Sequence, residues 1–354
     1  MRKGAAFLAL VMILVSYAAA GLAGQPLPYA RVKADVPAVW TRDFDTVNGP
    51  VTIDVAIQLP ARDTIPLLEL EPLCFDASKI ATLFPGARID TGAARCFVQM
   101  GAFGACVYPS EASWAMWPTE TGDAENAELS REDLGQQLQR LLGQIDLPEG
   151  AGYQVLGILG QSRTWLVDKK NTPIRPLNDH GSYAAYLRPQ VYGISLFDSW
   201  GFDQDSERLR GPGGEQPQLL YYDAENFNLL LSGYRPTRVL LEDCPLLPFE
   251  EIVREIGRLV ESGHLRQIYR IELCYLPMWS EGQISIVTVP AWALWGEYHE
   301  TATAETNQAP VDEYQRTIGG YPLLIPAQTG RVIDYADASP ERWTAATYLP
   351  EGGE

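Results

Sequence analysis

The side chains that could carry out chemistry are few and scattered. The chain of 354 residues contains three histidines. His180 lies in the polar run 178–182, the one local cluster that a catalytic loop could use. His264 follows a predicted helix, where a cation complements the helix dipole, so we interpret it as structural. His299 lies between two glutamates but lacks the second histidine of a metal site. We therefore expect no catalytic residue and no metal ligand set.

No motif of a known reaction is present. The chain lacks the Gly-x-Ser-x-Gly, Walker, His-Glu-x-x-His and dinucleotide-binding patterns. The acidic runs 43–45 and 203–207 resemble calcium loops but have neither the glycine nor the distal glutamate of that motif. A carboxylate pair for glycoside hydrolysis cannot be chosen from 45 acidic residues without a fold. The sequence favours a non-catalytic protein without a cofactor. A hydrolase or carbohydrate-binding protein with a site between two domains remains the alternative.

The five cysteines are an odd number. Cys96 and Cys106 flank a predicted hairpin turn and could face each other across it. Cys244 and Cys274 could meet where a strand packs back on the helix before it, which would leave Cys74 unpaired. The other interpretation is that all five are reduced thiols within the core. No Cys-x-x-Cys pair indicates a metal site.

The N-terminus indicates export from the cytoplasm. Residues 1–24 begin with Arg2 and Lys3, continue with an apolar run and end in small residues, as in a signal peptide. An uncleaved anchor over 5–24 is the alternative, because that length can cross a bilayer. The protein is therefore expected to be secreted or tethered to the membrane by its N-terminus. The net charge of −18 argues against nucleic acid as a partner.

The length after the signal, about 330 residues, predicts two domains. We expect α+β domains over 25–150 and 151–336, followed by a tail over 337–354. Period-two alternation predicts a strand over 51–59.

Two helices are expected in the first domain. Asp76 can cap a short helix that ends at Phe84. Ser130 and Asp133 form a capping pair for a second helix, which carries leucines on one face. Strands are expected near 95–100 and 105–108.

The second domain is predicted to contain a helix laid on an antiparallel four-stranded meander. The helix begins at Pro248, carries acids in its N-terminal half and ends near Gly263. The meander strands are expected at 265–276, 284–295, 321–325 and 331–335. A turn over 328–330 joins the last two. Earlier strands are expected at 153–159, 183–196, 219–222, 229–231 and 238–241.

The runs 246–252, 271–276, 289–292 and 324–333 resemble a family of uncharacterised secreted proteins and lipoproteins of clostridial Gram-positive bacteria. The last part is similar in pattern to the YycH/YycI regulators and to PepSY domains. The likeness covers 236–335, and 51–70 more weakly. Two features depart from the family: Pro326 stands where its turn has asparagine, and a lipobox cysteine is missing. The resemblance implies a cell-envelope protein of unknown activity. Because YycH and YycI restrain a membrane kinase by contact, the similarity to them favours a non-enzymatic interaction role.

Aromatic residues on adjacent predicted strands are the candidate partner-binding site. Trp292 and Trp295 should point to opposite faces of their strand, because they are three residues apart. One of them would then lie away from the face that the helix covers, where it could bind a protein partner or stack on a sugar. Trp279, Tyr275 and Tyr298 would extend this patch. The other interpretation is that these rings pack in the core. We expect an envelope or membrane protein as the partner, with cell-wall polysaccharide as the second candidate.

Overall fold

The computed structural model describes residues 24–46, 49–92, 95–100, 117–118, 129–161, 164–167, 173–176, 182–197, 202–203, 208–209, 219–263, 265–279, 285–298 and 322–333. The chain forms an α+β structure of two compact units. Unit 1 contains residues 1–71, 193–214 and 236–354, and unit 2 contains 72–192 and 215–235. The expected signal segment, except Gly24, and the expected tail lie outside the described residues.

The units are not divided at residue 150, where the sequence predicts a boundary. Helix α4 (Arg131–Gln144) and strand β7 (Ala151–Gln161) lie on either side of that position. They pack together, because the buried leucines of α4 share one core with Ile158 of β7. The Pro-Glu-Gly segment before β7 is therefore a turn inside unit 2. The chain passes from unit 1 into unit 2 and back more than once.

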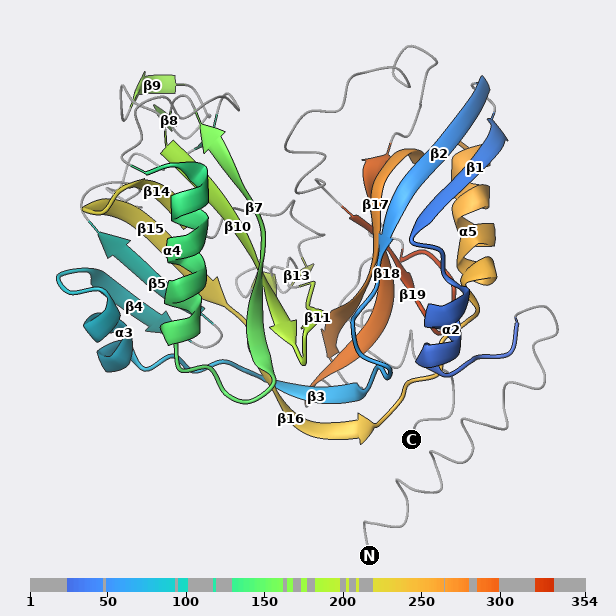
Figure 1. The fold of residues 1–354 in the computed structure, drawn as a ribbon, viewed down its shortest axis with the longest axis horizontal. Coiled ribbons are helices and arrows are strands. Elements are labelled where there is room, and N and C mark those ends of the chain that lie inside the picture. The colour runs from blue at the N-terminus through green and yellow to red at the C-terminus, as the bar shows by residue number, and fades with distance from the viewer. Residues whose placement is uncertain are drawn as a thin grey trace, which may run out of the picture. The chain divides into compact units, whose positions relative to one another are not determined.

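Unit 1 is built on a sheet with the strand order β1-β2-β17-β18-β3-β16. Its strands are β1 (Val39–Thr46), β2 (Gly49–Gln58), β3 (Leu67–Pro72), β16 (Tyr234–Leu241), β17 (Leu265–Trp279), β18 (Ile286–Tyr298) and β19 (Pro322–Pro326), which pairs with β18. Helices α2 (Tyr29–Asp35) and α5 (Phe249–Glu261) belong to the same unit, and Figure 1 shows α5 alongside β1. The expected strand at 51–59 and the expected helix after Pro248 are confirmed as β2 and α5.

The predicted four-stranded meander is not confirmed. Strands β17, β18 and β19 do follow one another in antiparallel pairs. The described part of the fourth expected strand, Arg331–Ile333, is not a strand, and residues 334–335 lie outside the description. The neighbour of β17 on its other side is β2, which comes from the N-terminal part of the chain and runs parallel to it. A parallel partner so distant in sequence leaves no local pattern.

Unit 2 is an antiparallel sheet with the order β7-β10-β14-β15-β5-β4. Its strands besides β7 are β4 (Arg88–Gly92), β5 (Arg95–Met100), β10 (Ser182–Val191), β14 (Leu219–Asp223) and β15 (Asn226–Ser232). Helices α3 (Ala77–Leu83) and α4 bury apolar side chains in the core formed by this sheet. Short strands of unit 2 are β6 (Trp117–Pro118), β8 (Thr164–Val167) and β9 (Pro173–Pro176), whereas the short strands β11 (Ile194–Ser195), β12 (Phe202–Asp203) and β13 (Arg208–Leu209) belong to unit 1.

Both helices of unit 2 begin as their sequences predict. The side chain of Ser130 accepts a hydrogen bond from the backbone N–H of Asp133 at 3.1 Å and donates one to the Asp133 carboxylate at 2.6 Å. The Asp76 carboxylate accepts hydrogen bonds from the backbone N–H groups of Ser78 and Lys79. These bonds satisfy amide donors that have no partner inside the helix. Local chemistry therefore fixes where α3 and α4 start.

Candidate binding site

The predicted aromatic patch is part of the core of unit 1. Trp292, Trp295 and Tyr275 are fully buried. The ring of Trp292 packs on Phe249 of α5 with centroids 5.1 Å apart, whereas that of Trp295 packs on Phe197 at 6.3 Å. The two tryptophans thus point to opposite faces, as predicted, but both faces are covered. The predicted binding role is corrected to core packing for these three residues.

The surroundings of β17 and β18 give further detail on the predicted patch. Trp279 and Tyr298 lie in β17 and β18, and their side chains are outside the described part of the structure. The guanidinium of Arg270 stacks over the Trp295 ring at 4.2 Å. The hydroxyl of Tyr275 donates a hydrogen bond to the carbonyl of Pro66 at 2.5 Å, and burial raises the pKa of this phenol. Tyr275 is therefore a buried structural residue.

Cys244 and Cys274 do not form a disulfide. Both are buried thiols outside any disulfide, and their surroundings place them on different sides of β17. Cys244 is close enough to Tyr275 to affect its ionisation, and Cys274, as the neighbour of Tyr275 in the strand, points the other way. The thiol of Cys274 instead contacts the carbonyl of Ala291 at 3.5 Å. The sulfur of Cys244 accepts a hydrogen bond from the Gln328 amide at 3.0 Å.

Cys96 is a free, buried thiol as well, and Cys106 lies outside the described residues. Burial raises the pKa of Cys244 to about 12 and that of Cys96 to about 11. Such thiols stay protonated at neutral pH and are poor nucleophiles. Cys74 is the exposed free cysteine, so the described cysteines provide neither a disulfide nor a buried reactive group.

The other sequence candidates for chemistry do not assemble into a site within the described ranges. All three histidines lie outside those ranges, as do residues 204–207. Asp43 of the first acidic run accepts a hydrogen bond from the Thr52 hydroxyl across the β1–β2 pair at 2.7 Å. Among the described residues, no group of three or more His, Cys, Asp or Glu could hold a metal ion.

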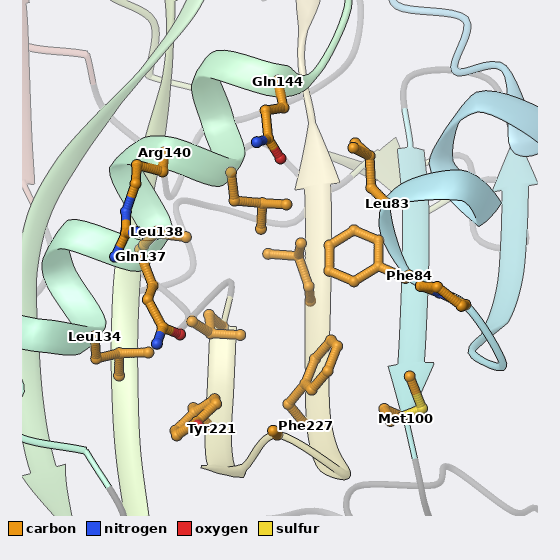
Figure 2. A pocket seen from close by; sticks show the side chains of 15 residues that line it. Leu83, Phe84, Met100, Leu134, Gln137, Leu138, Arg140, Gln144, Tyr221 and Phe227 are labelled. Carbon is orange, nitrogen blue, oxygen red and sulfur yellow. The ribbon is translucent and has the colours of Figure 1, made fainter.

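A pocket of about 440 Å³ lies in unit 2 between α3, α4 and the sheet. Figure 2 shows Leu134 and Leu138 of α4 on one side, Leu83 and Phe84 on the other, and Tyr221 and Phe227 between them. The lining is mostly apolar: Leu83, Phe84, Pro85, Met100, Leu134, Leu138, Leu141, Leu219, Tyr221, Ala224, Phe227 and Leu229. This volume lies within the range of about 300–1,000 Å³ that is usual for ligand pockets.

Each wall of the pocket follows from its local sequence. The leucines of α4 recur at spacings of three and four residues and therefore share one face of the helix. On the facing side, α3 ends where Phe84 closes its last turn, and the Phe84 ring packs on Phe227 of β15 at 5.6 Å. The gap that remains between these two anchored walls is the pocket.

Three polar side chains complete the lining, and all three come from α4. Gln137, Arg140 and Gln144 lie at the same helical spacing and form one exposed edge. The Arg140 Nε–H donates a hydrogen bond to the carbonyl of Gln136 at 3.3 Å. The described lining contains no carboxylate, imidazole or thiol. The site can therefore bind an apolar group beside a single positive charge, but its lining offers no general acid or base apart from the Tyr221 phenol.

Sequence reasoning missed this pocket because only one wall has a clear signal. The leucine stripe of α4 and its Gln-Arg-Gln edge can be recognised in the sequence. The opposite wall depends on β5 lying beside the β14–β15 hairpin, and β5 is separated from that hairpin by more than a hundred residues along the chain. Their pairing is a property of the fold.

The fold belongs to the α+β class and has a structural relative. An uncharacterised protein from Eubacterium rectale ATCC 33656 is similar in structure, with a TM-score of 0.50 and 15% sequence identity. The similarity covers 88% of this chain and 99% of that one, so it extends over both units. No known family profile and no curated protein matches the chain. Within the described residues, no helix combines the length and apolar character needed to cross a membrane.

Proposed function

We propose that this protein acts by binding rather than by catalysis, outside the cytoplasm, and that the pocket of unit 2 is its binding site. The partner in this proposal is an envelope or membrane protein that inserts an apolar group between α3 and α4. The observation that carries the proposal is an open pocket of about 440 Å³ with a mostly apolar lining. Protein interfaces concentrate binding energy where a large apolar side chain fills such a pocket.

The extracytoplasmic location in this proposal rests on the composition of residues 1–24 and on the family resemblance. The YycH and YycI proteins restrain a membrane kinase by contact. The segment that resembles them forms α5, β17, β18 and β19 in unit 1. The resemblance therefore supports the class of function, whereas the pocket in unit 2 supports the place of contact.

The described lining of this pocket does not favour a hydrolase or a carbohydrate-binding protein as its function. Hydrolysis needs a nucleophile or a pair of acid and base groups that converge on the substrate. Sugar binding needs several hydrogen-bonding groups beside an aromatic platform. The described lining of the pocket offers three polar edge residues and the phenol of Tyr221.

Position-specific photo-crosslinking in intact cells tests the proposal. A benzoylphenylalanine is placed at Gln137, which lines the pocket, or at Gln139, which is exposed on the same helix but does not line it. We expect a discrete adduct with one envelope protein from position 137 only. Leu141→Asp, which puts a carboxylate among the apolar lining, should abolish that adduct without changing the circular dichroism spectrum. Equal adducts from both positions, or none, would contradict the proposal.

A further inference from the structure

The polar edge of α4 defines what kind of group can enter the pocket. Arg140 provides the single cation of the described lining. A guanidinium has five N–H donors. The hydrogen bond to Gln136 uses the Nε–H, and Arg140 forms no ion pair with a described residue. No described residue therefore occupies the two terminal nitrogens, which have the fork geometry that suits a carboxylate.

The charge of the whole chain limits how acidic a ligand can be. With a net charge of −18, the protein repels a partner segment that carries many acids. One carboxylate next to an apolar group matches one arginine next to an apolar pocket. The ligand chemistry is therefore an apolar group that ends in a single carboxylate.

The two glutamines distinguish a peptide from a simple amphiphile. Gln137 and Gln144 lie on either side of Arg140 along the helix, and each offers both a donor and an acceptor. Neither makes a hydrogen bond to a described residue, and a main chain with alternating N–H and C=O groups can use both functions. The hydrocarbon tail of a fatty acid could use neither.

The volume of the pocket agrees with a peptide end. An apolar cavity of roughly 150 Å³ accommodates a benzene-sized ring. The pocket of about 440 Å³ has room for two apolar side chains. We infer that the pocket binds the apolar carboxyl terminus of a partner protein, with the terminal carboxylate on Arg140 and the last side chains between α3 and α4. This inference rests on the proposed function of the pocket.

Matched peptides test the inference on the full chain. The probes are acetylated pentapeptides that end in two residues chosen from Leu, Ile, Val and Phe, each made as the free acid and as the terminal amide. We expect the best acid to bind at least tenfold more tightly than its amide in isothermal titration calorimetry. Arg140→Gln should lower the affinity of the acid to that of the amide. Arg131→Gln, at the start of the same helix, should change neither affinity.

The other outcomes separate this inference from the proposed function. Equal binding of acid and amide would overturn the role of the carboxylate while leaving the pocket as a binding site. Binding of dodecanoate without binding of any peptide acid would overturn the inference, because it would show that the pocket binds a free amphiphile and not a protein terminus. Failure of peptides and dodecanoate to bind, while the crosslink at position 137 persists, would refute only the terminal-carboxylate inference. If no ligand binds and the crosslink at position 137 is also absent, both the proposed function and the terminal-carboxylate inference are refuted.

Discussion

Replacement of Trp292 by alanine should destabilise unit 1 strongly. The side chain is fully buried and packs on Phe249, with ring centroids 5.1 Å apart. A buried tryptophan removes about 150–250 Å² from water, which corresponds to roughly 4–6 kcal/mol at about 25 cal/mol per Å². This value is an upper bound, and alanine substitutions of buried Phe or Trp cost about 3–5 kcal/mol. We therefore expect a loss of about 4 kcal/mol in the free energy of unfolding.

Urea unfolding followed by circular dichroism measures this loss. With a slope of about 2–3 kcal/mol per M, the midpoint for unit 1 should fall by about 1.3–2 M. Trp292→Phe keeps an aromatic ring against Phe249 and should shift the midpoint by less than half as much. Hydrogen exchange should show the lost protection in α5, β17 and β18. A Trp292→Ala protein with an unchanged midpoint would refute the burial of this side chain.

Further predictions concern the helix cap, the thiols and a turn. Ser130→Ala removes the cap of α4 and should lower the unfolding free energy of unit 2 by about 1 kcal/mol in urea titrations, whereas Ser130→Asp should not. A disulfide-exchange reagent at pH 8 should modify the exposed Cys74 within minutes and leave buried Cys244 unmodified until denaturant is added; equal rates would contradict their burial. Because the folded pKa of Cys244 is about 12 and its ordinary value is 9.0, the unfolded chain releases this proton first as the pH rises. The contribution of this thiol to the free energy of unfolding is therefore complete below pH 9. Above pH 9 it falls by up to about 1.4 kcal/mol per pH unit. Cys244→Ala should reduce this pH dependence of the unfolding free energy in urea titrations at about pH 8–10.5. Gly330 has a φ of +64°, and an added Cβ would lie 2.9 Å from Leu247, so Gly330→Ala should lower the melting temperature measured by calorimetry; an unchanged value would contradict this turn geometry.

The elements that the sequence predicts correctly are those with a local cause. Helix α4 has a capping serine and a leucine face, and helix α5 has a proline start and acids in its first turn. Strand β2 alternates apolar and polar residues. In each case the residues that decide the structure lie within a few positions of one another. Such patterns can be recognised without knowledge of the fold.

What the sequence cannot predict depends on residues that are distant along the chain. Trp295 is buried because Phe197, almost a hundred residues earlier, packs on its ring. The sheet of unit 1 places β2 beside β17, more than two hundred residues apart. The boundary predicted at residue 150 is wrong because α4 and β7, on either side of it, pack into one core, and strands from distant parts of the chain, β5 and β15, complete that core. Local patterns contain no information about these pairings.

The candidate side chains are buried in unit 1 and exposed in unit 2, and this difference guides the choice of variants. The described side chains of the predicted patch in unit 1 are buried rings. Substitutions there should therefore lower the free energy of unfolding. In unit 2 the exposed Arg140 lines a pocket and forms no ion pair with a described residue, so its substitution should act on ligand affinity alone. A Trp292 variant that loses a partner would therefore say little about the contact surface. An Arg140 variant that loses one while keeping its unfolding midpoint would locate that surface on α4.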